Sequence, residues 1–151
     1  MKITSKNKQR CLDESQDRVL VRSQQRQTDH GEVFTPTELA LEILEQMPES
    51  IWEEGKTFLD PTCGNGQLLA PVAIIKRELG HKNWLSTIYG VDLMPDNVEE
   101  TRERLLAIAG DTLENRKILE NNIVEADGLK YDYSFGSDPF LDQFGDFFEA
   151  D

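Results

Sequence analysis

The sequence predicts an α/β fold: a partial Rossmann-like domain in which helices flank a parallel sheet. Short apolar segments with the length of buried strands alternate along the chain with longer segments that have helical apolar spacing. Three acidic residues, Asp60, Asp92 and Asp127, lie at the ends of the three predicted strands, and a glycine-rich turn follows the first. Ligands of such sheets bind beyond the carboxyl ends of the strands.

The first half of the predicted domain is a helix, a strand and a second helix. Residues 35–38 have a hydroxyl, a proline and a glutamate at the spacing of a capped helix start. Residues 57–60 form an apolar strand, and residues 67–79 are apolar almost all round, as in a helix packed on a sheet. The predicted inward face of the first helix consists of Leu39, Ala40, Ile43, Leu44 and Met47.

The second half repeats this alternation. Residues 87–92 predict a strand, residues 95–109 and 112–120 predict helices, and residues 122–126 predict a third strand. The predicted inward face of the helix over 95–109 consists of Val98, Arg102 (through its stem), Leu105, Leu106 and Ala109.

The composition predicts one globular, cytoplasmic domain. The chain has 151 residues, of which 38% are hydrophobic and 30% charged. No apolar run approaches the roughly 18 residues that cross a bilayer, and the N-terminus lacks the apolar stretch of a signal peptide. The sequence therefore favours a protein without a membrane partner. Two cysteines and two histidines, none closely spaced, argue against a disulfide framework and a structural zinc.

The charge is strongly negative and unevenly distributed. A net charge of -13 makes the chain a poor DNA clamp, because phosphate contacts supply most of the affinity for DNA. We expect DNA contact through a partner chain or a further domain. Residues 1–30 form a polar, basic arm with a helical stretch around Glu14 to Gln27, residues 31–133 the domain, and residues 134–151 an acidic tail. The simpler interpretation of these two charged ends is that both are solvated segments without a binding role.

The turn after the first strand is Asp60-Pro61-Thr62-Cys63-Gly64-Asn65-Gly66. Gly64 and Gly66 lack a Cβ, so the backbone can turn tightly and approach a ligand. An ordinary strand-to-helix turn would explain a lone Gly-x-Gly. A nicotinamide-dinucleotide fold is disfavoured because Leu69 stands where its third glycine belongs, and a P-loop is excluded because no Gly-Lys-Ser/Thr follows.

Two further carboxylates suit an adenosine-containing ligand. Asp92 can accept hydrogen bonds from both ribose hydroxyls, or it can serve as a carboxylate in the first turn of the next helix. Asp127 can accept a hydrogen bond from an adenine amino group, or it can be a solvated turn residue before Gly128.

Together these motifs resemble those of adenine-specific DNA methyltransferases. The segments 31–36, 60–66, 87–92 and 122–128 are similar to motifs X, I, II and III of that family, in the order of its gamma-type members and of type I modification subunits. The resemblance covers roughly residues 28–133, and the pairing of motif X with motif I is its most specific part. It implies the fold of S-adenosylmethionine-dependent methyltransferases and a place in restriction–modification.

The resemblance also implies a set of cofactor-binding residues. Motif X would lie over S-adenosyl-L-methionine, the motif I loop would hold its methionine part, and the residues after the second and third strands would hold its ribose and adenine. The positively charged sulfonium suits an acidic site. The residues concerned are Phe34, Thr35, Pro36, Asp60, Pro61, Cys63, Gly64, Gly66, Asp92, Leu93, Asp127 and Gly128.

The chain departs from the family at its catalytic motif. The family uses a polar residue, two prolines and an aromatic residue to bind the amine and stack on the flipped base. Residues 137–140 are Ser-Asp-Pro-Phe, and no apolar strand precedes them. An acidic turn is the favoured interpretation of this segment, so the catalytic residues stay unassigned.

The family's fold places its fourth strand beside the first. Without that neighbour, residues 57–60 would present an unpaired apolar edge. We expect it to be covered by the C-terminal phenylalanines (140, 144, 147 and 148), by a second copy in a homodimer, or by a separate subunit.

Three functions are consistent with these features. The first is the S-adenosylmethionine-binding module of a DNA adenine methyltransferase that is incomplete or needs a second chain. The second is a catalytically inactive methyltransferase-like protein that regulates a partner. The third is an acidic decoy that competes with DNA, which the combination of motifs X and I disfavours.

Overall fold

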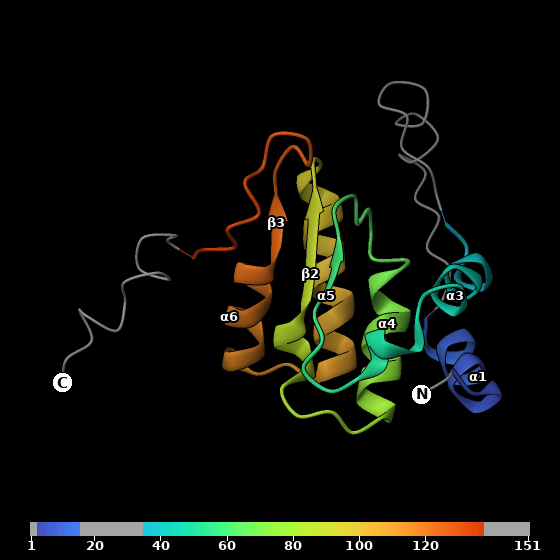
Figure 1. Ribbon diagram of the computed structural model, residues 1–151. Helices are drawn as coiled ribbons and strands as arrows, with labels where there is room; N and C mark the ends of the chain where they lie inside the picture. Colours follow the sequence, from blue (N-terminus) through green and yellow to red (C-terminus); the bar gives the residue numbers. More distant parts are fainter. Residues whose placement is uncertain (1–2, 16–34, 138–151) are drawn as a thin grey trace.

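A computed structural model of the protein describes residues 3–15 and 35–137. In chain order its helices and strands are α1 (Ser5–Glu14), α3 (Thr37–Glu45), η1 (Glu49–Trp52), β1 (Phe58–Asp60), α4 (Leu69–Glu78), η2 (Trp84–Thr87), β2 (Ile88–Asp92), α5 (Pro95–Ala109), α6 (Leu113–Asn122) and β3 (Ile123–Glu125). Figure 1 shows this arrangement.

The three strands form one parallel sheet in the order β1-β2-β3. Asp60 lies beside Gly90, and Asp92 lies beside Glu125 two residues further along β2. All three strands therefore end on the same side of the molecule, at the top of Figure 1. The predicted α/β fold with a parallel sheet and flanking helices is confirmed.

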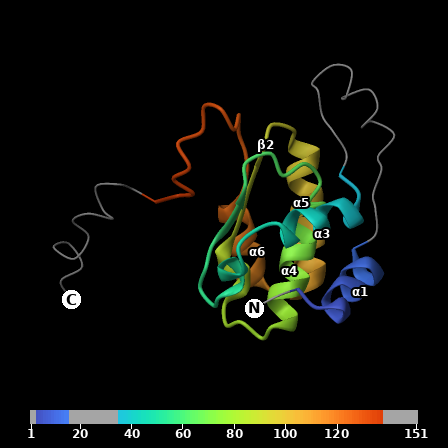
Figure 2. The same ribbon diagram turned by 45° about the vertical axis from the view of Figure 1, so that its right-hand side comes forward.

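One face of the sheet is covered by helices. Phe58, Ile88 and Ile123 share this face and are buried, with Ile88 and Ile123 fully enclosed. Helices α4 and α5 pack against each other, and Figure 2 shows them on the same side of the sheet. The apolar area buried between this helical layer and the sheet is the main source of stability of the fold.

The other face of the sheet is covered by the chain that follows β3. The ring of Tyr89 on β2 lies 4.7 Å from that of Phe135, and Tyr131 and Tyr133 stack beside Phe135. Leu59 of β1 shares this face but is 43% exposed. The aromatic cover thus protects the centre of the sheet and leaves the β1 side of this face open to solvent.

Helix α3 differs from its prediction at both its start and its inward face. The helix begins at Thr37, with Pro36 at the cap position and no side-chain cap hydrogen bond. Thr37, Ala40, Leu41 and Leu44 are buried, whereas Leu39 and Ile43 are exposed. The apolar residues surround more of this helix than one face can bury, so their spacing alone did not determine which side packs.

Helix α5 has the predicted bounds but a different inward face. Val98 and Leu105 are buried as predicted. Arg102 is half-buried, as expected for a side chain that faces inward through its stem only, and its guanidinium donates to the carbonyl of Ile123 at 2.6 Å. The arginine that is buried is Arg104, at 4% exposure.

The N-terminal segment contains a packed helix. α1 has a capping box between Thr4 and Asn7, and it packs against α3 and α4. Cys11 of α1 is fully buried, and its Sγ lies 3.8 Å from the carbonyl of Pro71. At least residues 5–14 of the predicted arm are therefore part of the folded body, whereas most of the helix predicted around Glu14 to Gln27 lies outside the described residues. Within the described ranges, no helix is both long and apolar enough to span a membrane.

Gly90 is where β2 and α4 approach most closely. A Cβ at this position would lie 2.8 Å from Cδ1 of Leu69 and 3.1 Å from Cβ of Cys63. Leu69 is fully buried, so it has no free space into which to turn. Only glycine allows the glycine-rich turn and the first turn of α4 to rest directly on the strand.

We predict that Gly90→Ala lowers the free energy of unfolding by about 1–3 kcal/mol, the usual range for an overpacked core. Urea unfolding followed by circular dichroism measures the loss. Leu69→Ala removes the clashing Cδ1, so Gly90→Ala should cost less in that background than in the wild type. Equal losses in both backgrounds would show that the contact with Leu69 does not set the packing.

Candidate functional site

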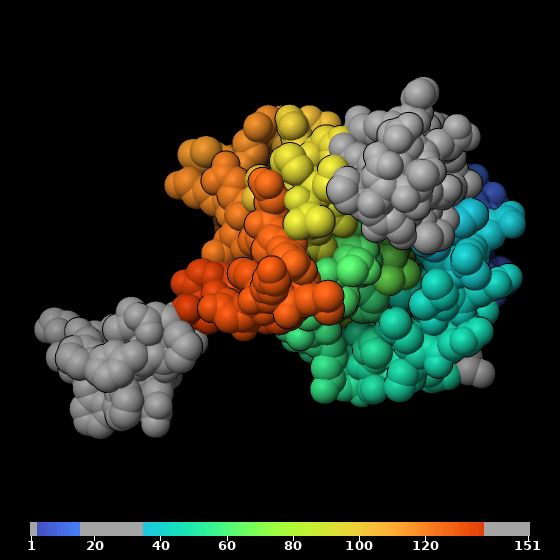
Figure 3. Space-filling view, turned by 90° about the horizontal axis from the view of Figure 1, so that it is seen from above, coloured from blue at the N-terminus to red at the C-terminus, as the bar shows by residue number. Residues whose placement is uncertain are grey.

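The candidate site lies beyond the carboxyl ends of β1 and β2, where three connecting segments meet. Figure 3 views the molecule from this side: the turn after β1 in green, the turn after β2 in yellow and the segment after β3 in orange lie next to one another. Each of these segments carries one of the acidic residues at a predicted strand end.

The turn after β1 is held against the sheet by its own backbone. The amide of Cys63 donates to the carbonyl of Val91 at 2.9 Å, and the amide of Gly66 donates to the carbonyl of Cys63 at 2.9 Å. Gly64 and Gly66 have φ angles of 53° and 90°, in the left-handed region that favours glycine. The expectation that these glycines permit a tight turn is confirmed.

Asp92 connects this turn to the start of α5. Its Oδ1 accepts a hydrogen bond from the amide of Gly64 at 3.1 Å. Its Oδ2 accepts one from the amide of Met94 and one from Nδ2 of Asn97, both at 3.0 Å. The contacts with Met94 and Asn97 show the helix-start role that the sequence offered for Asp92, and the contact with Gly64 adds a link to the glycine turn. Binding of a ribose by Asp92 stays a prediction.

Asp60 lies at the end of β1 with much of its surface removed from water. Burial raises the pKa of its carboxyl above the ordinary value, and the charge of Asp92 raises it further. The amide of Thr62 donates to Oδ1 of Asp60 at 3.1 Å and opposes the rise. Neither Asp60 nor Asp92 forms a salt bridge with a described lysine or arginine. Two carboxylates thus influence each other here, which favours the approach of a cation.

The segment after β3 touches the turn after β1 at Gly128. A Cβ on Gly128 would lie 2.7 Å from the carbonyl oxygen of Pro61, a backbone atom that cannot move aside easily. Asp127 accepts from the amide of Leu129 at 3.0 Å through Oδ1, in a local turn. The structure therefore brings Gly128 to the site, and it shows for Asp127 the turn geometry that was its simpler interpretation.

The remaining candidate residues differ in how they face the site. Thr35 is half-buried and Pro36 exposed, and the carbonyl of Thr35 accepts from Nε2 of Gln67 at 2.8 Å. Leu93 is 55% exposed. Cys63 is buried beneath the turn, where burial and then the charges of Asp92 and Asp60 raise the pKa of its thiol. Its contribution is therefore through its backbone. Phe34 lies outside the described residues.

A polar stripe on α5 supports the turn and was missed in the sequence. Asn97, Thr101 and Arg104 are buried at the spacing of one helix face. Asn97 donates to Asp92, the hydroxyl of Thr101 donates to the carbonyl of Gly64 at 2.9 Å, and Arg104 donates to the carbonyl of Asn65 at 2.9 Å. Polar residues at positions 97, 101 and 104 within an otherwise amphipathic helix were the available signal.

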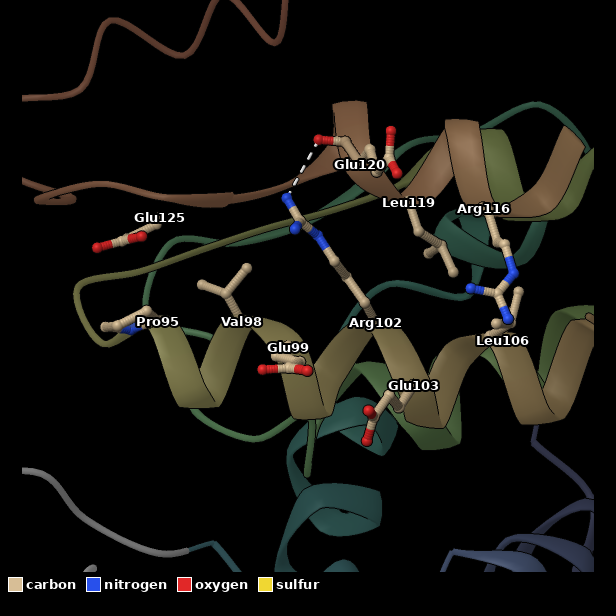
Figure 4. A pocket seen from close by; sticks show the side chains of 10 residues that line it. All are labelled: Pro95, Val98, Glu99, Arg102, Glu103, Leu106, Arg116, Leu119, Glu120 and Glu125. Atoms are coloured by element: carbon tan, nitrogen blue, oxygen red, sulfur yellow. Dashed lines mark hydrogen bonds between the residues drawn. The ribbon is translucent and has the colours of Figure 1, made fainter. Parts of the chain in front are cut away.

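A second hollow lies between α5 and α6 (Figure 4). It has a volume of about 490 Å³. Arg102 crosses it and donates to the carbonyls of Glu120 and Ile123, which ties the end of α6 to α5. This role explains Arg102 without a ligand. The residues that line the hollow are Pro95, Val98, Glu99, Arg102, Glu103, Leu106, Arg116, Leu119, Glu120 and Glu125.

The described residues gather no group of three or more histidine, cysteine, aspartate or glutamate side chains able to hold a metal ion.

We predict that Asp60→Asn stabilises the protein at neutral pH. Its raised pKa means that ionised Asp60 destabilises the folded state, a loss that develops as pH rises above the ordinary value of 3.8. Asparagine keeps the acceptor for Thr62 and removes the charge. The urea midpoint should increase at pH 7, and the gain should shrink as the pH falls towards 3.8.

Asp111→Asn is the matched control, because Arg116 lowers the pKa of that exposed aspartate and the sign is reversed. The urea midpoint of Asp111→Asn at pH 7 should equal that of the wild type or be lower. An Asp60→Asn protein no more stable than the wild type at pH 7 would contradict the conclusion that burial, together with the charge of Asp92, makes ionised Asp60 unfavourable in the folded state.

Comparison with known proteins gives one match. The model of the family described as N-6 DNA Methylase matches residues 19–140. This range includes the whole sheet, the glycine turn and helices α3 to α6. No curated protein and no solved structure matches the chain.

Proposed function

Since the chain belongs to the N-6 DNA methylase family, we propose that it binds S-adenosyl-L-methionine beyond β1 and β2 as a module for methylation of the adenine amino group in DNA. The bound cofactor supplies a methyl group on a positively charged sulfonium. The observation that carries the proposal is the pair Asp60 and Asp92, which flanks a turn whose two glycines have positive φ.

The residues of the turn fit such a ligand. A turn with left-handed glycines exposes backbone at close range, which suits the amino-acid part of the cofactor. Substituting either glycine would strain this conformation, whatever space surrounds it. The amide of Cys63 holds the turn against β2, and the carbonyl of Pro61 lies close to Gly128. Gln67 donates to the carbonyl of Thr35, the residue before Pro36. Phe34 is assigned to the cofactor through the family motif alone.

Asp92 is proposed to bind the ribose, and the segment around Asp127 and Gly128 to border the adenine. A carboxylate offers about four lone-pair positions. Asp92 uses three for Gly64, Met94 and Asn97, so its remaining capacity suits a ribose hydroxyl. Leu93 is exposed immediately after it and offers an apolar surface to a flat ring. The acidic pair Asp60 and Asp92 provides electrostatic attraction for the sulfonium.

The proposal is tested by calorimetric titration of the full chain with S-adenosylmethionine. Micromolar binding is expected for the wild type. Asp92→Asn should weaken it by roughly 10- to 100-fold, because a hydrogen bond to a charged acceptor is lost. Asparagine retains the size of the side chain and one acceptor, so that the fold is disturbed as little as possible.

Glu125→Gln is the control, since Glu125 lies beside Asp92 in the sheet, is exposed, and has the same charge. It should bind like the wild type. Absence of binding by the wild type, or equal losses in both variants, would overturn the assignment of the site.

A second function is a regulatory protein of this family that does not transfer the methyl group. One observation favours it: the hydroxyl of Ser137 donates to the carbonyl of Ser134 at 2.6 Å, in a local turn rather than towards the site. Residues 138–140 of the Ser-Asp-Pro-Phe segment lie outside the described residues. Transfer of a labelled methyl group to DNA adenine separates the two functions, since only the first produces methyladenine.

We further propose that DNA is reached through another chain or domain, and that β1 pairs with a further strand. The net charge of -13 opposes DNA contact by the chain alone. Among residues 35–137, β1 pairs with β2 on one side and with no strand on the other. A strand edge with unpaired N–H and C=O groups can form hydrogen bonds with a strand from another segment or chain.

We predict that hydrogen exchange finds the β1 amides that face away from β2 protected in the full chain. The sedimentation coefficient then identifies the source of the pairing strand: dimer mass indicates a second copy, and monomer mass indicates the chain's own C-terminal residues. Fast exchange of these amides in a stable monomer would show that the edge is open.

A further inference from the structure

A buried polar cluster contacts the glycine turn from α5, α1 and the start of α3. Its central member is Arg104 of α5, at 4% exposure. Nη1 of Arg104 donates to the carbonyl of Asn65 at 2.9 Å and to Oε1 of Gln67 at 2.7 Å. Nη2 donates to the hydroxyl of Ser15 at 3.0 Å. One guanidinium thus contacts the turn after β1 and the end of α1.

Gln67 extends this cluster to the start of α3. While its Oε1 accepts from Arg104, its Nε2 donates to the carbonyl of Thr35 at 2.8 Å. The hydroxyl of Thr37 donates to the carbonyl of Ser15 at 2.9 Å. Gln67, Thr37 and Ser15 are all buried. The segment entering α3 and the segment leaving α1 are therefore held to the same side chains as the glycine turn.

The guanidinium is better explained by the turn than by stability alone. Burying a charged group is unfavourable unless its donors find acceptors, and apolar residues of similar size often stabilise a core as well. Here the carbonyl of Asn65 points into the interior, between two glycine-permitted bends. A planar group with several donors satisfies this carbonyl and Gln67 together, which fixes the direction of the turn.

We propose that Arg104 is a positioning residue: with Gln67 it sets the conformation of the glycine turn and ties it to Ser15 and Thr35. The inference rests on the proposed function where it concerns cofactor affinity, but the conformation of the turn can be measured without any ligand. Neither Arg104 nor Gln67 touches the cofactor in this scheme. Their effect passes through the backbone of residues 64–67.

The test combines hydrogen exchange of the ligand-free full chain with titration by S-adenosylmethionine. Arg104→Met removes the donors and keeps much of the volume. It should speed exchange of the Gly64, Gly66 and Ala70 amides, because their hydrogen bonds to Asp92, Cys63 and Gly66 require the conformation of the turn. It should weaken cofactor binding by about tenfold or more. Arg104→Lys retains the charge and one donor direction, so both effects should be intermediate.

Arg116→Met is the matched control, because Arg116 is a surface arginine that pairs with the exposed Asp111. It should match the wild type in both measurements. Gln67→Met, nearly isosteric, is the second variant in case Arg104→Met does not fold, and it should also loosen the turn. A general loss of stability alone would speed exchange in β2 and β3 as much as in the turn.

The proposal is overturned if folded Arg104→Met and Gln67→Met retain wild-type exchange at the turn and wild-type affinity. It is also overturned if exchange rises equally throughout the sheet. Failure of the wild type to bind cofactor would instead refute the proposed function, while the exchange of the turn amides still decides whether Arg104 positions the turn.

Discussion

The carboxylate of Asp92 accepts hydrogen bonds from Gly64, Met94 and Asn97, and the arrangement of the site depends on this junction. The backbone carbonyl of Asp92 also accepts a hydrogen bond, of 2.9 Å, from the amide of Ala126 just after β3. The turn after β1, the start of α5 and the segment just after β3 are therefore all hydrogen-bonded to one residue at the end of β2. A parallel sheet aligns its strand ends, but it does not by itself fix the loops beyond them. Asp92 does so here.

This junction places negative charge where the protein interior would otherwise avoid it. Asp60 is buried close enough to Asp92 for the two charges to influence each other, and the raised pKa of Asp60 reflects that burial and repulsion. Arg104 donates to neutral groups of the turn and of α1 and forms no salt bridge with Asp60 or Asp92. The negative charge of the two carboxylates is therefore not neutralised by the arginine that supports the turn.

The sequence predicted the sheet, the order of its helices and the residues at its strand ends, because these depend on local apolar spacing and on glycine. Helix α5 was predicted with its bounds from Pro95 to Ala109. The inward faces of α3 and α5 were predicted in part, since Leu39 and Ile43 proved exposed and the burial of Thr101 and Arg104 was not predicted. Which side of a helix packs is decided by its partners, here α4 and the glycine turn. Thr101 and Arg104 are buried because backbone carbonyls of the turn accept their hydrogen bonds. The spacing of apolar residues along the sequence does not reveal such tertiary partners.

The two faces of the sheet are covered by different kinds of side chain. The helical face is closed by aliphatic side chains, whereas the opposite face is covered over β2 by the ring of Phe135 and its aromatic neighbours. Gly136 lies where a Cβ would meet Oδ1 of Asn121 at 2.6 Å, so this cover is fitted closely to the end of α6. Towards β1 it stops, and Leu59 is left 43% exposed beside the edge of β1 that pairs with no other strand of the described residues. An aromatic cover that shields β2 and leaves β1 accessible concentrates the available pairing surface beside Asp60, so a strand that joined there would adjoin the proposed cofactor site directly.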